Sequence, residues 1–256
     1  MIVKPDPPVL YCDASRTFGH PYTIVAGAIA SVQKWTDFDV AWSALLAENR
    51  LLYFRMSEFA HSVGQFAKGW KHDERRRQDF FLSLVRIVVE HVSVWVGAAL
   101  AQREFEAADR IYQVHESYQP YTICGLTCIG LAYKWRDNNR LEYLPLEYLF
   151  EDGDEPSHQS QLRQRCKEWY DQYPIFRKKL GDPAKPQELF TPLQVGDIAA
   201  YEIGKAYSLL DPGAEELWVR FRTSFGLLAH IPHTWGELHD DKIRAEMNMR
   251  GVPKRS

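Results

Sequence analysis

The chain has 256 residues with 45% hydrophobic side chains, which is enough for one large packed domain or two small ones. Its formal net charge of -3 argues against a protein that coats nucleic acid through bulk positive charge, although a local basic groove is compatible with it. The 4 cysteines lack disulfide-framework spacing and no segment reaches the ~18 apolar residues of a membrane span, so we expect a cytoplasmic protein.

The first predicted strand, residues 9–15, is an apolar run bounded by prolines that closes on one carboxylate, Asp13. Ligands collect at the carboxyl ends of strands in open α/β sheets, so Asp13 is a candidate site residue. A turn cap formed with Ser15 is the alternative. Residues 22–31 predict a second strand, antiparallel to the first, and residues 37–50 have the apolar spacing of a helix.

A third strand is predicted at residues 51–56, and Glu58 follows where it ends. The alternative for Glu58 is the first turn of a helix, where a carboxylate interacts favourably with the helix dipole. After a loop at residues 61–72, we expect a helix at residues 75–91. A fourth strand, predicted at residues 92–98, has no acid at its end.

A later strand, predicted at residues 144–150, runs directly into an acidic cluster. Crowded carboxylates repel one another unless a cation neutralises them, and clusters of oxygen atoms suit hard divalent ions. Either Glu151 or Asp152 can face such an ion, because neighbours on a strand point to opposite faces. Glu151 is the preferred ligand and Asp154 an auxiliary one, whereas an exposed acidic turn is the alternative.

Another acid lies among small and apolar residues in a late helix that begins at Thr191. Asp197 is in the early turns of that helix, where a carboxylate needs a cation, an arginine or a metal as partner. Residues 175–180 predict a short strand with the best local basic patch for a phosphate backbone. Residues 214–256 predict helices, and their histidines fit no tight metal motif. The other predicted helices are residues 102–112, 121–135, 157–173 and 191–210.

Taken together, the acids make a stronger case for a metal site than each acid does alone. If the strands share one sheet, their carboxyl ends can bring four acids into one site: Asp13, Glu58, Glu151 and Asp197. Four converging acids can hold two Mg2+ or Mn2+ ions, which clamp the attacking and leaving oxygens during phosphodiester cleavage.

Four motifs of the chain resemble those of a poorly characterised prokaryotic family related to ribonuclease H. They are YCDAS, FRMSEF, YLFEDGD and TPLQVGDIAAYEI, and they span about residues 9 to 210 in matching order. That family typically has Asp-Glu-Ser on its first strand, a glutamate motif after its third, an acid ending a later strand, and a Leu-Gln-x-x-Asp helix. The resemblance implies a ribonuclease H-like mixed α/β sheet flanked by helices at residues 1–211. Residues 212–256 are expected to form a helical C-terminal extension packed on the same domain.

The resemblance also implies a function, that of a divalent-metal-dependent nuclease acting on RNA or DNA with Mg2+ or Mn2+. By motif match, Gln194 is a neighbour that orients Asp197. The implied metal ligands are Asp13, Glu58, Glu151 and Asp197, with Asp154 as auxiliary. The residues expected to contact the nucleic acid are Ser15, Arg177, Lys178, Lys179 and Gln194.

One departure from the family pattern supports an alternative function. Ala14 stands where the family commonly has Glu, so one carboxylate is absent. This departure and the acidic net charge favour a catalytically weak or inactive module that binds or regulates a protein partner, in a defence or mobile-element system.

Overall fold

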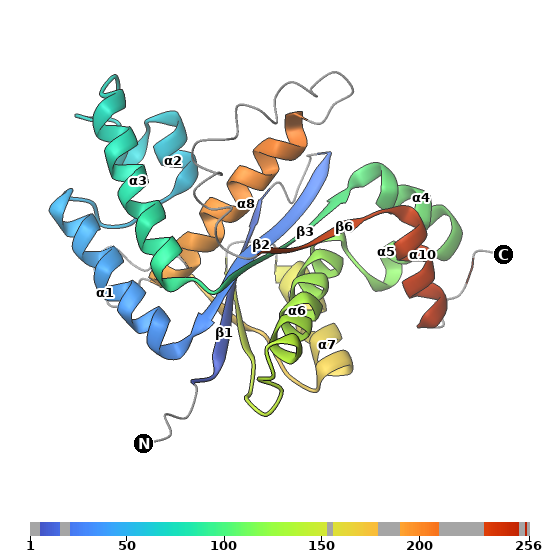
Figure 1. Ribbon diagram of the computed structural model, residues 1–256. Helices are drawn as coiled ribbons and strands as arrows, with labels where there is room; N and C mark the ends of the chain where they lie inside the picture. Colours follow the sequence, from blue (N-terminus) through green and yellow to red (C-terminus); the bar gives the residue numbers. More distant parts are fainter. Residues whose placement is uncertain are drawn as a thin grey trace.

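The computed structural model describes residues 6–15, 21–152, 156–178, 190–209, 233–250 and 254. One mixed sheet runs through its centre and has helices on both faces (Figure 1). The strands are β1 Pro8–Ser15, β2 Tyr22–Ser31, β3 Val94–Ala101, β4 Glu147–Glu151, β5 Ile175–Arg177 and β6 His233–Leu238. The helices are α1 Val32–Glu48, α2 Met56–His61, the 3-10 turn η1 Gly64–Phe66, α3 Glu74–His91, α4 Gln102–Tyr112, α5 Val114–Ser117, α6 Pro120–Asn138, α7 Pro156–Tyr170, α8 Thr191–Leu209 and α10 Asp240–Met249.

The 6-stranded sheet has the order β5-β4-β1-β2-β3-β6. Strands β1, β2 and β3 pair antiparallel in sequence order, as expected for the first two. Strand β4 runs parallel to β1, β5 runs parallel to β4, and β6 runs parallel to β3. Strand β1 therefore lies inside the sheet, with its carboxyl end next to that of β4.

The predicted strand at residues 51–56 is wrong. Residues 51–55 form no strand, and Met56 already begins α2. The physical reason lies in the hydrogen bonds of the backbone. The amides of Phe54 and Met56 donate to side chains of α8 instead of to a neighbouring strand. The third strand of the sheet is β3, which was expected as the fourth.

The expected C-terminal extension is not purely helical. Residues 233–238 form β6, which lengthens the sheet beside β3. The sequence did not predict this short strand, because it lacks a strong apolar pattern of its own. It joins the sheet by pairing with β3, which is distant in the chain. Helix α10 matches the expected helix in this region, whereas the expected helix near residue 217 lies outside the described residues.

Small residues on β2 let helices approach both faces of the sheet. Helices α1, α2, α3 and α8 cover one face, and α4, α6, α7 and α10 cover the other (Figure 1).

At Gly27 a β carbon would lie 2.0 Å from the carbonyl oxygen of Tyr11 and 2.8 Å from the sulfur of Cys12. Only glycine therefore permits this close pairing of β1 and β2.

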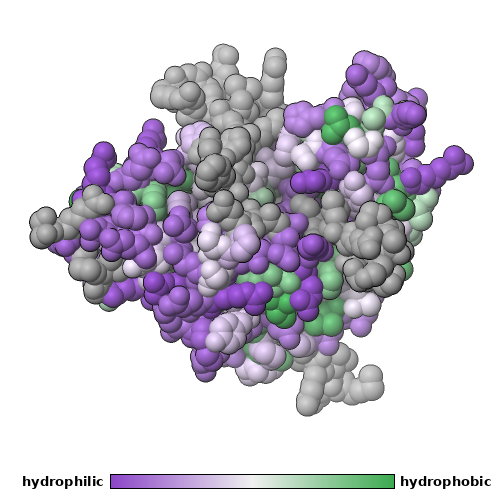
Figure 2. All heavy atoms as spheres, turned by 180° about the vertical axis from the view of Figure 1, so that it is seen from behind, coloured by the Kyte–Doolittle hydropathy of each residue, from purple (hydrophilic) through white to green (hydrophobic). Residues whose placement is uncertain are grey.

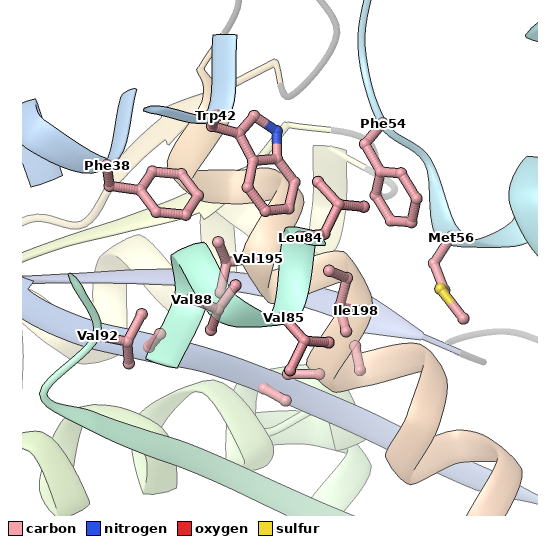
Figure 3. Packing of buried hydrophobic residues seen from close by; sticks show 14 of the residues in the cluster. Phe38, Trp42, Phe54, Met56, Leu84, Val85, Val88, Val92, Val195 and Ile198 are labelled. Carbon is pink, nitrogen blue, oxygen red and sulfur yellow. The ribbon is translucent and has the colours of Figure 1, made fainter. Parts of the chain in front are cut away.

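The core between α1, α3 and α8 is rich in aromatic side chains (Figure 3). The ring of Phe38 stacks on Trp42 at 4.9 Å, and Trp42 meets Phe54 edge to face at 6.0 Å. Leu84 of α3 and Ile198 of α8 belong to the same buried cluster. Such arrangements contribute packing energy beyond the burial of area, so the aromatic cluster helps to hold α1, α3 and α8 on this face of the sheet.

The coloured part of the face that Figure 2 shows is largely hydrophilic, with small hydrophobic areas. None of the helices in the described part of the chain has the length and apolar character needed to cross a membrane.

Buried tyrosines predict a loss of stability in alkali. Burial raises the pKa of Tyr170 from 10.0 to about 12, so the folded protein keeps this proton while the unfolded chain releases it. The stabilising contribution is fully present below pH 10.0 and is lost as the pH rises toward about 12. Between pH 9 and pH 12 we expect the unfolding free energy of Tyr170→Phe to fall by about 2 kcal/mol less than that of the wild-type protein. Denaturant unfolding of both proteins at pH 9 and pH 12 checks it, and an equal loss in both would contradict it.

Candidate functional site

The strand register places Asp13 beside Glu151. Cys12 pairs with Phe150 between the parallel strands β1 and β4, so the next residues along each strand, Asp13 and Glu151, are also neighbours. Both lie on the face covered by α1, α3 and α8, because Tyr11 and Leu149, two residues earlier, pack into that core. Adjacent strands are about 4.8 Å apart, so the two carboxylates occupy adjacent positions.

Arg177 extends this row by one strand. It pairs with Glu151 between β4 and β5 and is exposed. Its guanidinium lies 5.9 Å from the ring of Phe190, and its Nη1 donates to the carbonyl of Phe176 at 3.1 Å. Two acids and one arginine therefore lie in a row across the parallel strands β1, β4 and β5, at the carboxyl ends of these strands.

The neighbouring acid Asp152 belongs to a different environment. Its Oδ1 accepts a hydrogen bond from Nε2 of Gln159 in α7 at 2.7 Å, and α7 covers the opposite face of the sheet. The structure therefore places Glu151, not Asp152, on the face of Asp13. Asp154 and Lys179 lie outside the described residues.

Helix α8 crosses β1 directly at Asp13. A β carbon at Gly196 would lie 2.9 Å from the backbone nitrogen of Asp13 and 3.1 Å from its Cβ. The glycine therefore lets the backbone of α8 touch the strand. Asp13 is only 5% exposed under this helix, and Asp197 is the next residue after the point of contact.

Asp197 and Gln194 hold the irregular segment before α2. Oδ2 of Asp197 accepts from the amide of Met56 at 2.6 Å, and Oε1 of Gln194 accepts from the amide of Phe54 at 2.8 Å. Oε1 of Gln194 also accepts from Nε1 of Trp42 at 2.9 Å. Gln194 is completely buried, and its Nε2 has no hydrogen-bond partner among the described residues. Its observed role is therefore to anchor the core, and it does not hydrogen bond to Asp197.

Glu58 lies in the first turn of α2 rather than at the end of a strand, so the helix-start alternative describes its position. The side chain is half-buried, and the hydroxyl of Tyr53 donates to its Oε1 at 3.1 Å. Because Met56, two residues earlier, is bonded to Asp197, the segment that carries Glu58 is attached to α8. Tyr53 and Met56 had no recognisable signal in the sequence.

The remaining expected residues lie around this edge of the sheet. Ser15 is half-buried at the end of β1 and pairs with Ile24 of β2. Lys178 is exposed directly after β5. Together with Arg177, it places positive charge at the carboxyl end of β5, the strand next to β4.

The donor chemistry of the site suits a hard divalent cation, since carboxylate oxygens are the ligands that Mg2+ prefers. However, no group of three or more His, Cys, Asp or Glu side chains within the described ranges is arranged to hold a metal ion. What the structure brings together is the pair Asp13 and Glu151, with Asp197 on the helix above. The observed carboxylate positions therefore supply a partial ligand set.

Gly196→Ala tests the contact between α8 and β1. The added methyl would meet backbone atoms of Asp13, which cannot rotate away, so we expect a loss of about 1–3 kcal/mol in unfolding free energy. Gly125→Ala in α6 is the control, because its nearest neighbour is the flexible end of Leu162 at 3.0 Å. Alanine also favours helix by about 1 kcal/mol at both positions. Denaturant unfolding measures both, and equal effects would contradict the proposed contact.

Fold and site together define an α/β protein with an acidic pair at the carboxyl edge of a mixed sheet. No protein-family model matches the chain, and no curated protein sequence matches it. An assignment of function therefore depends on the residues of the site.

Proposed function

We propose that the protein is a divalent-metal-dependent nuclease of ribonuclease H-like fold, which hydrolyses phosphodiester bonds of RNA or DNA at the edge formed by β1 and β4. One observation carries the proposal: Asp13 and Glu151 lie side by side on β1 and β4, and α8, which carries Asp197, crosses β1 at Asp13. The mixed sheet, with β1 between an antiparallel and a parallel neighbour, supports the fold assignment.

In this proposal Asp13, Glu151 and Asp197 would hold two Mg2+ or Mn2+ ions, which would supply activation of the attacking water and stabilisation of charge on the scissile phosphate. Asp13 and Glu151 offer carboxylate oxygens from rigid strands, which keeps the donors preorganised. The contact of Gly196 with β1 excludes water from one side of Asp13. Arg177 and Lys178 attract the phosphate backbone to the neighbouring strand.

A second candidate is a binding or regulatory module of the same fold that has lost efficient chemistry. Two observations favour it: Ala14 occupies a position where the similar family has a carboxylate, and the described acids form no three-ligand group. In this case Arg177 and Lys178 still recognise nucleic acid, or the site edge binds a protein partner. Either candidate fits a cytoplasmic protein.

The deciding experiment separates cleavage from binding. Purified protein is incubated with labelled single- and double-stranded RNA and DNA, with Mn2+, with Mg2+ or with chelator, and the products are resolved by length. Fluorescence anisotropy of the same oligonucleotides measures binding. The nuclease predicts metal-dependent products from at least one substrate, whereas binding without products under every condition would support the second candidate.

A further inference from the structure

The carboxylate of Glu58 occupies a space that exists because residue 64 is glycine. A β carbon at Gly64 would lie 2.0 Å from Oε2 of Glu58 and 2.6 Å from its carboxyl carbon. Gly64 also has a φ of +57°, a conformation that residues with side chains rarely adopt. The glycine therefore both allows the turn and leaves room for the acid.

The opposite side of this space is formed by Tyr53. Its hydroxyl lies 3.1 Å from Oε1 and 3.4 Å from Oε2 of Glu58, so it can donate to either oxygen. Gln65 ties the two sides together, because its side chain accepts from the amide of Leu52 at 2.6 Å and donates to the carbonyl of Tyr53 at 3.2 Å. The distance between Tyr53 and Gly64 is therefore set by the fold.

The same segment is fastened to α8. The amides of Phe54 and Met56 donate to Gln194 and Asp197, so two hydrogen bonds hold this stretch of chain against that helix. Glu58 follows in the first turn of α2. A half-buried carboxylate with a fixed backbone and a fixed hydrogen-bond donor has few orientations open to it.

We propose that Tyr53 and Gly64 are positioning residues that hold the carboxylate of Glu58 in one orientation, and that Glu58 serves the proposed site from α2, whose first residue, Met56, is bound by Asp197. This inference rests on the proposed nuclease function and extends it to residues outside the four-acid set. The two positioning residues act through Glu58 and do not contact the substrate.

The test compares two glycines of the same loop. Gly69 also has a positive φ, +73°, but the nearest atom to its added β carbon is Nη1 of Arg76 at 3.4 Å. Gly64→Ala and Gly69→Ala therefore share the backbone strain, and only Gly64→Ala displaces Glu58. We expect the thermal midpoint of Gly64→Ala to fall about 3 °C further than that of Gly69→Ala. In a Glu58→Ala background this additional loss should disappear.

Activity provides the second readout. With Mn2+ and a cleaved oligonucleotide, Gly64→Ala should lower kcat about a hundredfold and Tyr53→Phe about tenfold, both with nearly unchanged KM. Glu58→Asp is shorter by one methylene, so combining it with Gly64→Ala should restore part of the lost kcat. A purely structural role for Gly64 would move stability without this rescue.

The outcomes separate the two proposals. Equal thermal losses for the two glycine variants, unaffected by Glu58→Ala, would overturn the positioning of Glu58. If Gly64→Ala shows the expected extra thermal loss and Glu58→Ala removes it, but the wild-type protein cleaves no substrate, the nuclease function would be overturned. The catalytic purpose of the positioning would fall with it.

Discussion

Asp13→Asn is expected to abolish Mn2+-dependent cleavage while the protein stays folded. The substitution keeps an acceptor oxygen for the amide of Ala14, which now donates to Oδ1 at 2.7 Å, but it removes the negative charge. Metal ions stabilise the transition state by several kcal/mol, so losing one anionic ligand should lower kcat/KM at least about a thousandfold. Asp197→Asn should have a similar effect and still accept from Met56.

Product formation over time, with circular dichroism spectra of each variant, measures this loss. Asp152→Asn is the matched control, because Asp152 is adjacent to Glu151 in sequence but is bonded to Gln159 on the other face. We expect it to retain activity within about twofold, since Asp152 faces α7 and not the carboxylates of Asp13 and Glu151. Full cleavage by both Asp13→Asn and Asp197→Asn would end the proposed mechanism.

Gln194→Met is expected to destabilise the protein by about 3 kcal/mol or more. Methionine has nearly the same length but no acceptor, so the amide of Phe54 and Nε1 of Trp42 would both lose their hydrogen bond inside the core. Each buried donor left without an acceptor costs about 1–3 kcal/mol. Urea unfolding measures the change in free energy.

Trp42→Phe provides the control for this prediction. It removes one of the two donors together with part of the ring, so the double variant Trp42→Phe/Gln194→Met should be less destabilised than the sum of the single variants. The expected shortfall is about 1 kcal/mol, the cost of the donor that no longer exists. Strict additivity would show that Gln194 does not stabilise Trp42 in the folded protein.

The sequence was most informative where local patterning and tertiary environment agree. Strands β1 and β2, and helices α3 and α4, have the expected positions because their apolar residues repeat with the period of the element that they form. The choice of Glu151 over Asp152 could only be stated as a preference. The pairing of Cys12 with Phe150, a contact across more than a hundred residues, places Glu151 beside Asp13.

Residues 51–56 show why the site could not be completed from sequence. Their apolar run is typical of a strand, yet their amides are bound by side chains of α8, which lie about 140 residues away in the chain. Glu58 accordingly lies at the helix start that was the alternative expectation, and not at the end of a strand. Gly64, which makes room for that acid, is an ordinary loop glycine in the sequence.

Local periodicity by itself determined the central strands and most helices, because burial of one face requires a repeat that is visible along the chain. Tertiary structure decided which acids are neighbours, which face Glu151 occupies, and that residues 233–238 join the sheet. The physical reason is that strand register and side-chain capping of distant backbone amides depend on partners that no local window contains.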